Sequence, residues 1–301
     1  MDNIKESRES SMQNPPIGPG EPFQLLFNDL PAGKPSLPAE FRNIYPGDWQ
    51  IPMTPIIKGR PYIYTDFAIS RDGRITYNEE GYVGGSDITQ TNRADWWFMA
   101  FLRTRADAIM NGIGTVTLEV GTLWTAEDLY PEDAAVFTEL RRYYGHTKPP
   151  ILTILSHDGR LNFNAASLQR DDMHVVLATT TEGAAYARQF EVPARLDIHD
   201  LGVKSADLQR TVDMLYSDYG VRHLLSEGGS TVQAGLLNAG LIDEEFVTWC
   251  PSFVGRSKDK FRPSYTEGVA WHPTTAPYSK PISLHRNGDL LYLRTRCRYG
   301  G

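Results

Sequence analysis

From Pro61 onward, short apolar runs alternate with longer segments of helical periodicity. A β-rich run at 62–70 precedes a helical segment at 89–106, and strand-like runs follow at 107–112 and 150–156. Strands that alternate with helices indicate βαβ units and a mostly parallel sheet. The alternation therefore predicts an α/β fold in which helices flank a central sheet.

The same pattern continues to the C-terminus. Further helices are predicted over 131–145, 181–190, 205–220 and 230–239, and further strands over 173–180, 222–227 and 244–255. Thr89 or Thr91 is expected to cap the helix at 89–106, and Gly240 to end the helix at 230–239. Asn287-Gly288 separates two strand-like runs in 282–298, which predicts a C-terminal antiparallel hairpin.

Residues 1–55 differ from the rest, because they hold ten of the 20 prolines. Proline fixes φ and lacks an N–H donor, so this region is predicted to be an extended arm with one short helix near 23–30. The arm wraps either its own domain or a partner subunit. Residues 1–20 fit a disordered tail equally well. The predicted organisation is an arm over 1–55, partly disordered, and one domain over 56–301.

Composition and charge exclude several classes of protein. The net charge of −7 argues against binding to nucleic acid or to an anionic membrane. The N-terminus lacks the apolar core of a signal peptide, and no apolar run approaches the length of a membrane span. Two widely separated cysteines suggest a reducing compartment and show no metal-ligand spacing. We expect a cytoplasmic protein without a bound metal.

Two predicted strands end in glycine-rich turns, NGIGT at 111–115 and EGGST at 227–231. Ligands bind beyond the carboxyl ends of strands in an open α/β sheet. Glycine allows close approach to the backbone, and the N–H groups at a helix start suit a phosphate. Two such turns can hold the pyrophosphate of a dinucleotide. Each turn alone can also be a tight strand-to-helix connection that binds nothing.

A third motif, FAISRDGRI at 67–75, precedes both turns. In this order, A-x-S-x-D-G, A-D-A-I-x-x-G-x-G-T and E-G-G-[ST] resemble the pyrimidine reductase family of riboflavin biosynthesis. The resemblance covers roughly residues 60–255. It implies a dihydrofolate reductase-like fold, a homodimer, and hydride transfer from NADPH to C1′ of a ribosylamino-pyrimidine phosphate.

The resemblance also implies site residues. It assigns NADPH contacts to Ala68, Gly112, Gly114, Thr115, Ser156, Arg160, Gly228, Gly229, Ser230, Thr231 and Val232. It assigns substrate contacts to Ser70, Arg93 and Glu119. Glu227 and Asp72 are the candidates for protonating the reduced C=N or C=O group, with a bound water as the alternative.

Simpler roles remain open for some of these residues. Asp72 also fits a plain turn, and Glu227 fits a helix cap or the partner of a lysine. Ser156 and Arg160 also fit an ordinary loop, although an arginine suits the 2′-phosphate of NADPH.

The sequence departs from the family in one segment. The family's L-T-x-R arginine, which helps to hold the substrate phosphate, has no counterpart in 117–133. The deaminase signature of bifunctional relatives, H-x-E with P-C-x-x-C, is also missing. The alternatives are therefore a reductase of another heterocycle, such as a pterin or a secondary metabolite, and a nucleotide-binding protein without turnover.

Overall fold

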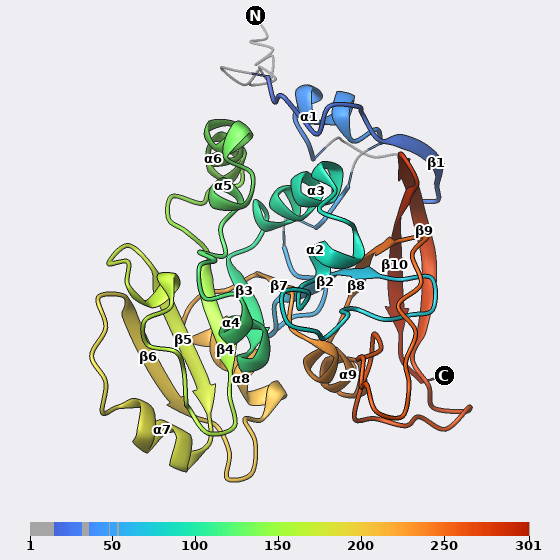
Figure 1. The fold of residues 1–301 in the computed structure, drawn as a ribbon. Coiled ribbons are helices and arrows are strands. Elements are labelled where there is room, and N and C mark those ends of the chain that lie inside the picture. The colour runs from blue at the N-terminus through green and yellow to red at the C-terminus, as the bar shows by residue number, and fades with distance from the viewer. Residues whose placement is uncertain (1–14, 32–35, 48, 53, 301) are drawn as a thin grey trace, which may run out of the picture.

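The computed structural model describes residues 15–31, 36–47, 49–52 and 54–300. Within these residues, ten strands form one sheet in the order β1-β9-β10-β8-β2-β7-β3-β4-β5-β6 (Figure 1). The seven strands from β8 to β6 are parallel, whereas β10, β9 and β1 are antiparallel. This confirms the predicted α/β fold with a mostly parallel sheet and a C-terminal antiparallel hairpin.

The strands are β1 (Gln24–Asn28), β2 (Tyr62–Ile69), β3 (Ala108–Gly112), β4 (Ile151–Leu155), β5 (His174–Thr179), β6 (Arg195–Asp200), β7 (His223–Ser226), β8 (Glu244–Trp249), β9 (Tyr278–Asn287) and β10 (Leu290–Arg298). The helices are α1 (Ala39–Ile44), α2 (Gly85–Ile88), α3 (Arg93–Arg103), α4 (Ile113–Leu118), α5 (Ala126–Leu129), α6 (Ala134–Tyr143), α7 (Thr181–Ala187), α8 (Leu208–Ser217) and α9 (Ser230–Asn238). Short 3₁₀ turns lie at Pro131–Asp133 and Ala166–Leu168. None of the helices in the described part of the chain is long and apolar enough to cross a lipid bilayer.

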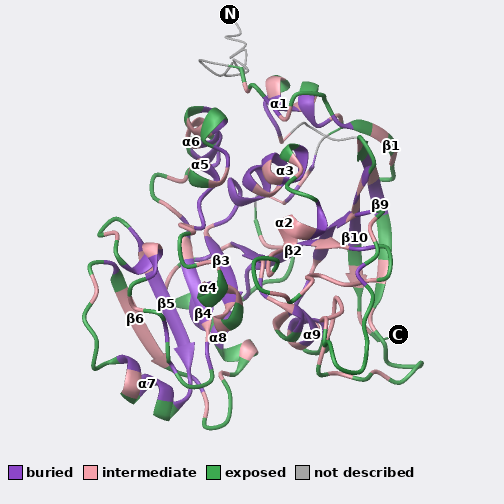
Figure 2. Cartoon of the chain, in the orientation of Figure 1, coloured by how far each residue is buried: buried purple, intermediate pink, exposed green. Residues whose placement is uncertain are grey.

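The parallel strands are covered on both faces, so their side chains alternate between two apolar cores. In β3, Ile109 packs into the core that includes α3, α6 and the N-terminal segment. Its neighbours Ala108 and Met110 pack into the second core, with α8 and α9. Figure 2 shows the central strands largely buried and the edge strand β6 only half buried. Strand β6 was not predicted, although Leu196 and Ile198 alternate with polar residues along it and pack, partly buried, against the first core.

The short helix predicted near 23–30 is wrong, because this segment contains strand β1. β1 pairs antiparallel with β9 and supplies hydrogen-bond partners to the backbone groups on the outer edge of that long strand. Phe23, just before β1, is buried with its ring centroid 4.8 Å from that of Tyr292. A helix this short has little stability of its own, so sheet pairing and the burial of Phe23 decide the local structure.

The predicted cap of α3 is also wrong, because Asn92 occupies that position. The side-chain oxygen of Asn92 accepts hydrogen bonds from the backbone N–H groups of Ala94 at 2.8 Å and Asp95 at 3.3 Å. Thr91 has a φ of 54°, which does not fit the extended backbone of an N-cap. Thr89 instead ends α2.

Two predicted glycine positions are confirmed. Gly240 follows α9 with a φ of 68°, the left-handed conformation that commonly ends helices. Asn287 and Gly288 join β9 to β10, and Gly288 has a φ of 55°.

The described residues of the N-terminal segment, 15–31, 36–47 and 49–52, pack on the rest of the domain beside α3 and the tip of the β9–β10 hairpin (Figure 1). Phe41, Tyr45 and Trp49 are buried in the same core as Phe101 of α3. The indole of Trp49 stacks on Phe101 with ring centroids 4.0 Å apart. Residues on both sides of the predicted boundary at 55 therefore share one core. The prediction of disorder falls largely on residues 1–14, which lie outside the described residues.

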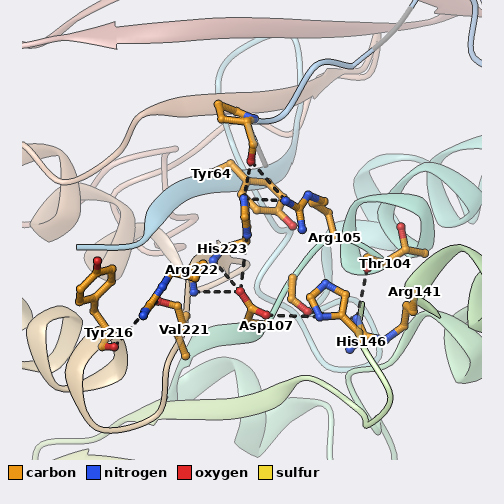
Figure 3. A network of polar contacts seen from close by, with 12 residues as sticks. Tyr64, Thr104, Arg105, Asp107, Arg141, His146, Tyr216, Val221, Arg222 and His223 are labelled. Carbon is orange, nitrogen blue, oxygen red and sulfur yellow. Dashed lines mark hydrogen bonds and ion pairs between the residues drawn. The ribbon is translucent and has the colours of Figure 1, made fainter. Parts of the chain in front are cut away.

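A buried polar network fixes the amino ends of the parallel strands (Figure 3). The Oδ2 atom of Asp107 accepts hydrogen bonds from the backbone N–H groups of Arg222 at 2.9 Å and His223 at 2.8 Å. Its Oδ1 atom lies 3.3 Å from Nδ1 of His146. Burial alone would raise the pKa of Asp107, but these partners lower it to about 2. The network joins β3 to β7 at the end of the sheet opposite to the glycine turns.

Candidate active site

Two adjoining cavities lie at the carboxyl ends of the central strands. The larger has a volume of about 650 Å³ and the smaller about 390 Å³, within the usual range for small-ligand sites. Their walls have four residues in common, Gly114, Thr115, Gly229 and Ser230. Since the two glycine turns supply all four, the turns form the partition between the cavities.

The two glycine turns pack directly on each other. A Cβ atom added to Gly229 would lie 3.6 Å from Oγ1 of Thr115, in ordinary contact. A Cβ added to Gly228 would lie 2.8 Å from Cγ1 of Val232, which is too close. Close packing against Val232 therefore explains why residue 228 is a glycine. By contrast, a Cβ on Gly114 would meet no atom within 4 Å and would project into open space beside both cavities.

Helix α9 begins at the smaller cavity. Its N-cap is Gly229, which provides no side-chain acceptor for the first N–H groups of the helix. Ser230, Thr231 and Val232, the first residues of α9, line the smaller cavity together with Gly112. The structure thus brings together the residues that the sequence assigned to pyrophosphate binding.

The end of β4 forms another part of the wall of the smaller cavity. Ser156 lines the smaller cavity, and its Oγ atom accepts a hydrogen bond from the backbone N–H of Gly159 at 3.0 Å. Arg160 lies outside the lining of both cavities. Its Nε atom is 3.6 Å from Oδ2 of Asp158, and its guanidinium lies 4.6 Å from the ring centroid of Tyr186.

Glu227 lines the larger cavity in a two-point ion pair that the sequence did not reveal. Its carboxylate oxygens accept hydrogen bonds from Nε and Nη2 of Arg103, both at 2.7 Å. Both side chains are buried. Burial lowers the pKa of Arg103, but the neighbouring Glu227 carboxylate outweighs this and raises it. The partner of Glu227 is therefore an arginine on α3, not the lysine considered from the sequence.

Asp66 and Asp95 are two further carboxyl groups in the larger cavity that sequence analysis missed. Asp66 lies on β2 and is 9% exposed. Burial, followed by the charges of Asp95 and Glu227, raises the pKa of Asp66 well above its usual value. Burial also raises the pKa of Asp95 to about 6. The clue in the sequence was a charged residue within the apolar run 62–70.

One face of α3 carries the missed cavity residues. Asp95, Met99 and Arg103 are four residues apart, so they lie on the same side of the helix. All three line the larger cavity, and so does Trp96. Polar residues at helical spacing within an apolar helix were the available signal.

Ser70 and Asp72 form a turn outside the lining of both cavities. Asp72 accepts hydrogen bonds from Oγ of Ser70 at 2.8 Å and from the backbone N–H groups of Val254 at 3.0 Å and Gly255 at 2.8 Å. Burial raises the pKa of Asp72, but these donors more than offset it and lower the pKa. The pair ties the end of β2 to the loop after β8.

The remaining predicted residues divide between cavity and surface. Ala68 and Glu119 line the larger cavity. Burial and the charge of Glu227 raise the pKa of Glu119 more than the charge of Arg103 lowers it, so the pKa lies above its usual value. Arg93 lies outside the lining, where Nη1 contacts Oε1 of Glu132 at 2.8 Å on the exposed start of α3.

The fold and the two cavities define the chain as an α/β protein with a ligand site at the carboxyl ends of its parallel strands. The RibD C-terminal domain family matches residues 61–270. The chain therefore belongs to this family of oxidoreductases, and the resemblance inferred from its motifs is confirmed.

Two archaeal relatives are both named 2,5-diamino-6-ribosylamino-4(3H)-pyrimidinone 5′-phosphate reductase. The Archaeoglobus fulgidus protein is 26% identical over 196 residues, which cover 65% of this chain and 83% of that protein. The Methanothermobacter thermautotrophicus protein is 28% identical over 200 residues, covering 65% and 80%.

Solved structures share the fold. A pyrimidine reductase-like protein from Corynebacterium diphtheriae aligns with a TM-score of 0.60 at 18% identity, over 79% of this chain and 92% of that chain. RibD from Acinetobacter baumannii aligns with a TM-score of 0.57 at 19% identity, over 80% of this chain. This chain spans 59% of the A. baumannii protein. These alignments confirm the predicted dihydrofolate reductase-like fold.

Proposed function

We propose that this protein is an NADPH-dependent reductase that transfers a hydride to the C=N or C=O carbon of a small heterocycle. The observation that carries the proposal is the pair of glycine turns that separates two adjoining cavities. One cavity has room for a nucleotide and the other for a substrate. The resemblance makes 5-amino-6-(5-phosphoribosylamino)uracil reductase of riboflavin biosynthesis the most similar activity. The two archaeal relatives are named as reductases of a related pyrimidinone 5′-phosphate.

The residues present fit a dinucleotide. The open space at Gly114 and the missing side-chain cap of α9 leave backbone N–H groups for a pyrophosphate. Ser156, also in the lining of the smaller cavity, suits contact with the adenosine ribose. NADPH, when bound, supplies the hydride, while the chain positions the two reactants and excludes water. The exposed Arg160 is our candidate for contact with the 2′-phosphate.

We propose Asp66 as the proton donor to the reduced group. Asp72, the first candidate from the sequence, points its acceptors at backbone N–H groups outside the cavity lining. Glu227, the second, has both oxygens on Arg103. Asp66 lies in the cavity, and burial favours its protonated form. It therefore meets the two requirements for a general acid better than either earlier candidate.

Thermal shifts with NADPH and with NADH test the cofactor. A ligand at 100 times its Kd stabilises the folded protein by about 2.7 kcal/mol, which raises Tm by a few degrees. We expect a larger shift with NADPH than with NADH. No shift with either, in a folded sample, contradicts the proposal and favours a protein that has kept the fold but lost the cofactor.

Oxidation of NADPH in the presence of a panel of heterocycles then separates a catalyst from a non-catalytic binder. Pyrimidines, pterins and related heterocycles belong in this panel, because the substrate could come from outside riboflavin biosynthesis. The homodimer implied by the resemblance and the cytoplasmic location expected from the sequence composition remain part of the proposal. Light scattering of the purified chain checks the dimer, and fractionation of the source cells checks the location.

A further inference from the structure

One wall of the larger cavity is formed by a segment with little packing of its own. Residues 75–84, here called the wall segment, contribute Ile75, Thr76, Asn78, Gly81, Val83 and Gly84 to the lining of that cavity. Among residues 71–87, all of which the structure describes, none is buried. Segments with few buried contacts open at a low cost in free energy. The position of this wall therefore depends on the contacts that hold the segment from outside.

A second segment, residues 256–268 after β8, holds the wall segment and is here called the bridging segment. Arg74 and Ser264 form an antiparallel bridge where the two segments meet. The backbone N–H of Ile75 donates to the carbonyl oxygen of Pro263 at 3.2 Å. Backbone pairing therefore fixes the base of the wall segment, whereas side chains hold its tip.

Glu79 makes the charged contacts at the tip of the wall segment. Its Oε1 atom accepts hydrogen bonds from Nζ of Lys260 at 2.9 Å and from Nη2 of Arg262. The side-chain amide of Asn78 donates to the carbonyl oxygen of Phe261 at 2.9 Å. The side chain of Glu79 is 38% exposed and that of Lys260 is 62% exposed, so water and salt screen their ion pair. These contacts hold the tip in place and can still open at low cost.

The other side of the bridging segment is anchored to the helix that begins at the smaller cavity. The hydroxyl of Tyr265 accepts a hydrogen bond from Nε2 of Gln233 on α9 at 2.6 Å and donates to Oε1 of Glu245 at 2.7 Å. Gln233 and Glu245 are both buried. The backbone N–H of Glu267 donates to the carbonyl oxygen of Ser230, which lines both cavities, at 3.3 Å. The bridging segment thus contacts the first turn of α9 on one side and the wall segment on the other.

We propose that Glu79 is a positioning residue that couples the two cavities. A nucleotide at the start of α9 orders the bridging segment, and Glu79 passes this ordering to the wall of the larger cavity. Cofactor binding in the smaller cavity therefore prepares the larger cavity for the second reactant, and by linkage each ligand raises the affinity for the other. This coupling deepens the proposed function and rests on it, because it requires a nucleotide bound beside α9.

Hydrogen–deuterium exchange of the free protein tests whether Glu79 holds the wall. Glu79→Gln removes the negative charge, and Lys260→Met removes one of its two partners. Each variant should exchange the amides of the wall segment about two- to fivefold faster than the parent, the range expected for an exposed ion pair. Glu80→Gln is the matched control, because Glu80 is exposed and forms no ion pair with any described residue. Parent-like exchange in both Glu79→Gln and Lys260→Met overturns the inference.

Exchange with a bound nucleotide tests the coupling. The probe is 2′-phospho-ADP-ribose, which lacks the nicotinamide ring of NADPH and so cannot place that ring in the larger cavity. In the parent and in Glu80→Gln, the probe should slow exchange in both segments by at least about fivefold. In Glu79→Gln the bridging segment should remain protected, whereas slowing in the wall segment should fall below about twofold. Equal protection of the wall segment in Glu79→Gln and the parent, or none in the parent, overturns the inference.

The thermal shift with NADPH separates failure of the coupling from failure of the proposed function. A protein that binds NADPH but shows no protection of the wall segment remains a candidate reductase whose two cavities act independently. A folded protein that binds neither NADPH nor the probe contradicts the proposed function and the coupling together. Exchange of the free protein still decides whether Glu79 holds the wall.

Discussion

Asp66 and Asp72 lie six residues apart at the end of one strand, and their surroundings give the two carboxyl groups opposite properties. Burial raises the pKa of Asp66 well above its usual value. Burial has the same tendency at Asp72, but hydrogen bonds from Val254, Ser70 and Gly255 lower its pKa overall. Burial therefore favours the protonated form of the first carboxyl group, whereas hydrogen bonds favour the ionised form of the second, which fixes a turn.

This contrast predicts different outcomes for two matched variants. Asp66→Asn should lower kcat by at least about 100-fold, because it removes the proposed general acid. Its Kd for NADPH should stay unchanged. Asp72→Asn should lower Tm and leave kcat within about threefold of the parent, because it disturbs only the turn. Steady-state kinetics with a substrate from the panel check both. A large loss of kcat in Asp72→Asn alone would restore that residue as the proton donor.

Asp95 predicts a pH-dependent stability. Its pKa rises from 3.8 to about 6 on folding, so between these values the unfolded chain binds fewer protons and stability falls as pH rises. The full effect is about 3 kcal/mol. Asp95→Asn carries no charge, so it should exceed the parent in stability by up to about 3 kcal/mol near pH 7 and match it near pH 4.

Urea unfolding at several pH values checks this prediction. Glu191→Gln, a change at an exposed carboxylate outside the linings of both cavities, is the matched control. Lower stability of Asp95→Asn than of the parent near pH 7 would show that the carboxylate has a stabilising partner.

At the scale of single elements, Gly114 at the start of α4 tests whether the cofactor approaches the first glycine turn. Gly114 lies in α4, and a Cβ there meets no atom of the chain. Gly114→Ala should therefore keep or raise Tm, since alanine favours helix by about 1 kcal/mol over glycine. The added methyl group projects beside both cavities, so NADPH should bind at least about tenfold more weakly.

Gly121→Ala is the matched control for this variant. A Cβ at Gly121 also meets no atom within 4 Å, and Gly121 lines neither cavity. Thermal shifts with NADPH on both variants make the comparison. Equal NADPH binding by Gly114→Ala and Gly121→Ala would mean that the cofactor does not approach this turn.

Most elements that depend on local sequence signals were predicted, whereas elements that depend on contacts between distant residues were not. Six of the seven parallel strands, all except β6, and helix α9 were predicted, because apolar runs and Gly240 are local signals. β1 was not, because its pairing with β9 joins segments about 260 residues apart in sequence. In the site, the glycine turns were predictable from composition. The Arg103–Glu227 pair was not, because it depends on the packing of α3 over the sheet.

At the scale of the whole molecule, the proline-rich segment is part of the folding unit. Trp49 is 1% exposed, and its Nε1 atom donates to the hydroxyl of Tyr144 at 3.0 Å. The backbone carbonyl of Trp49 also accepts a hydrogen bond from Arg294 of β10. One residue of the segment thus contacts α3, the end of α6 and the C-terminal hairpin. Proline content alone indicated an arm, because composition carries no information about such distant contacts.

This packing predicts that the segment stabilises the entire domain. Trp49→Ala should lower the free energy of unfolding by about 3–5 kcal/mol, the usual effect of emptying a buried tryptophan site. Ile17→Ala, in the same segment but with 70% of the residue exposed, should change it by less than about 0.5 kcal/mol. Urea unfolding monitored by far-ultraviolet circular dichroism measures both, because that signal reports helices throughout the chain. If Trp49→Ala unfolds with the parent midpoint, the segment lies on the domain without supporting it. A single transition shifted to lower urea, with an unchanged slope, would instead show that the segment and the sheet fold as one cooperative unit.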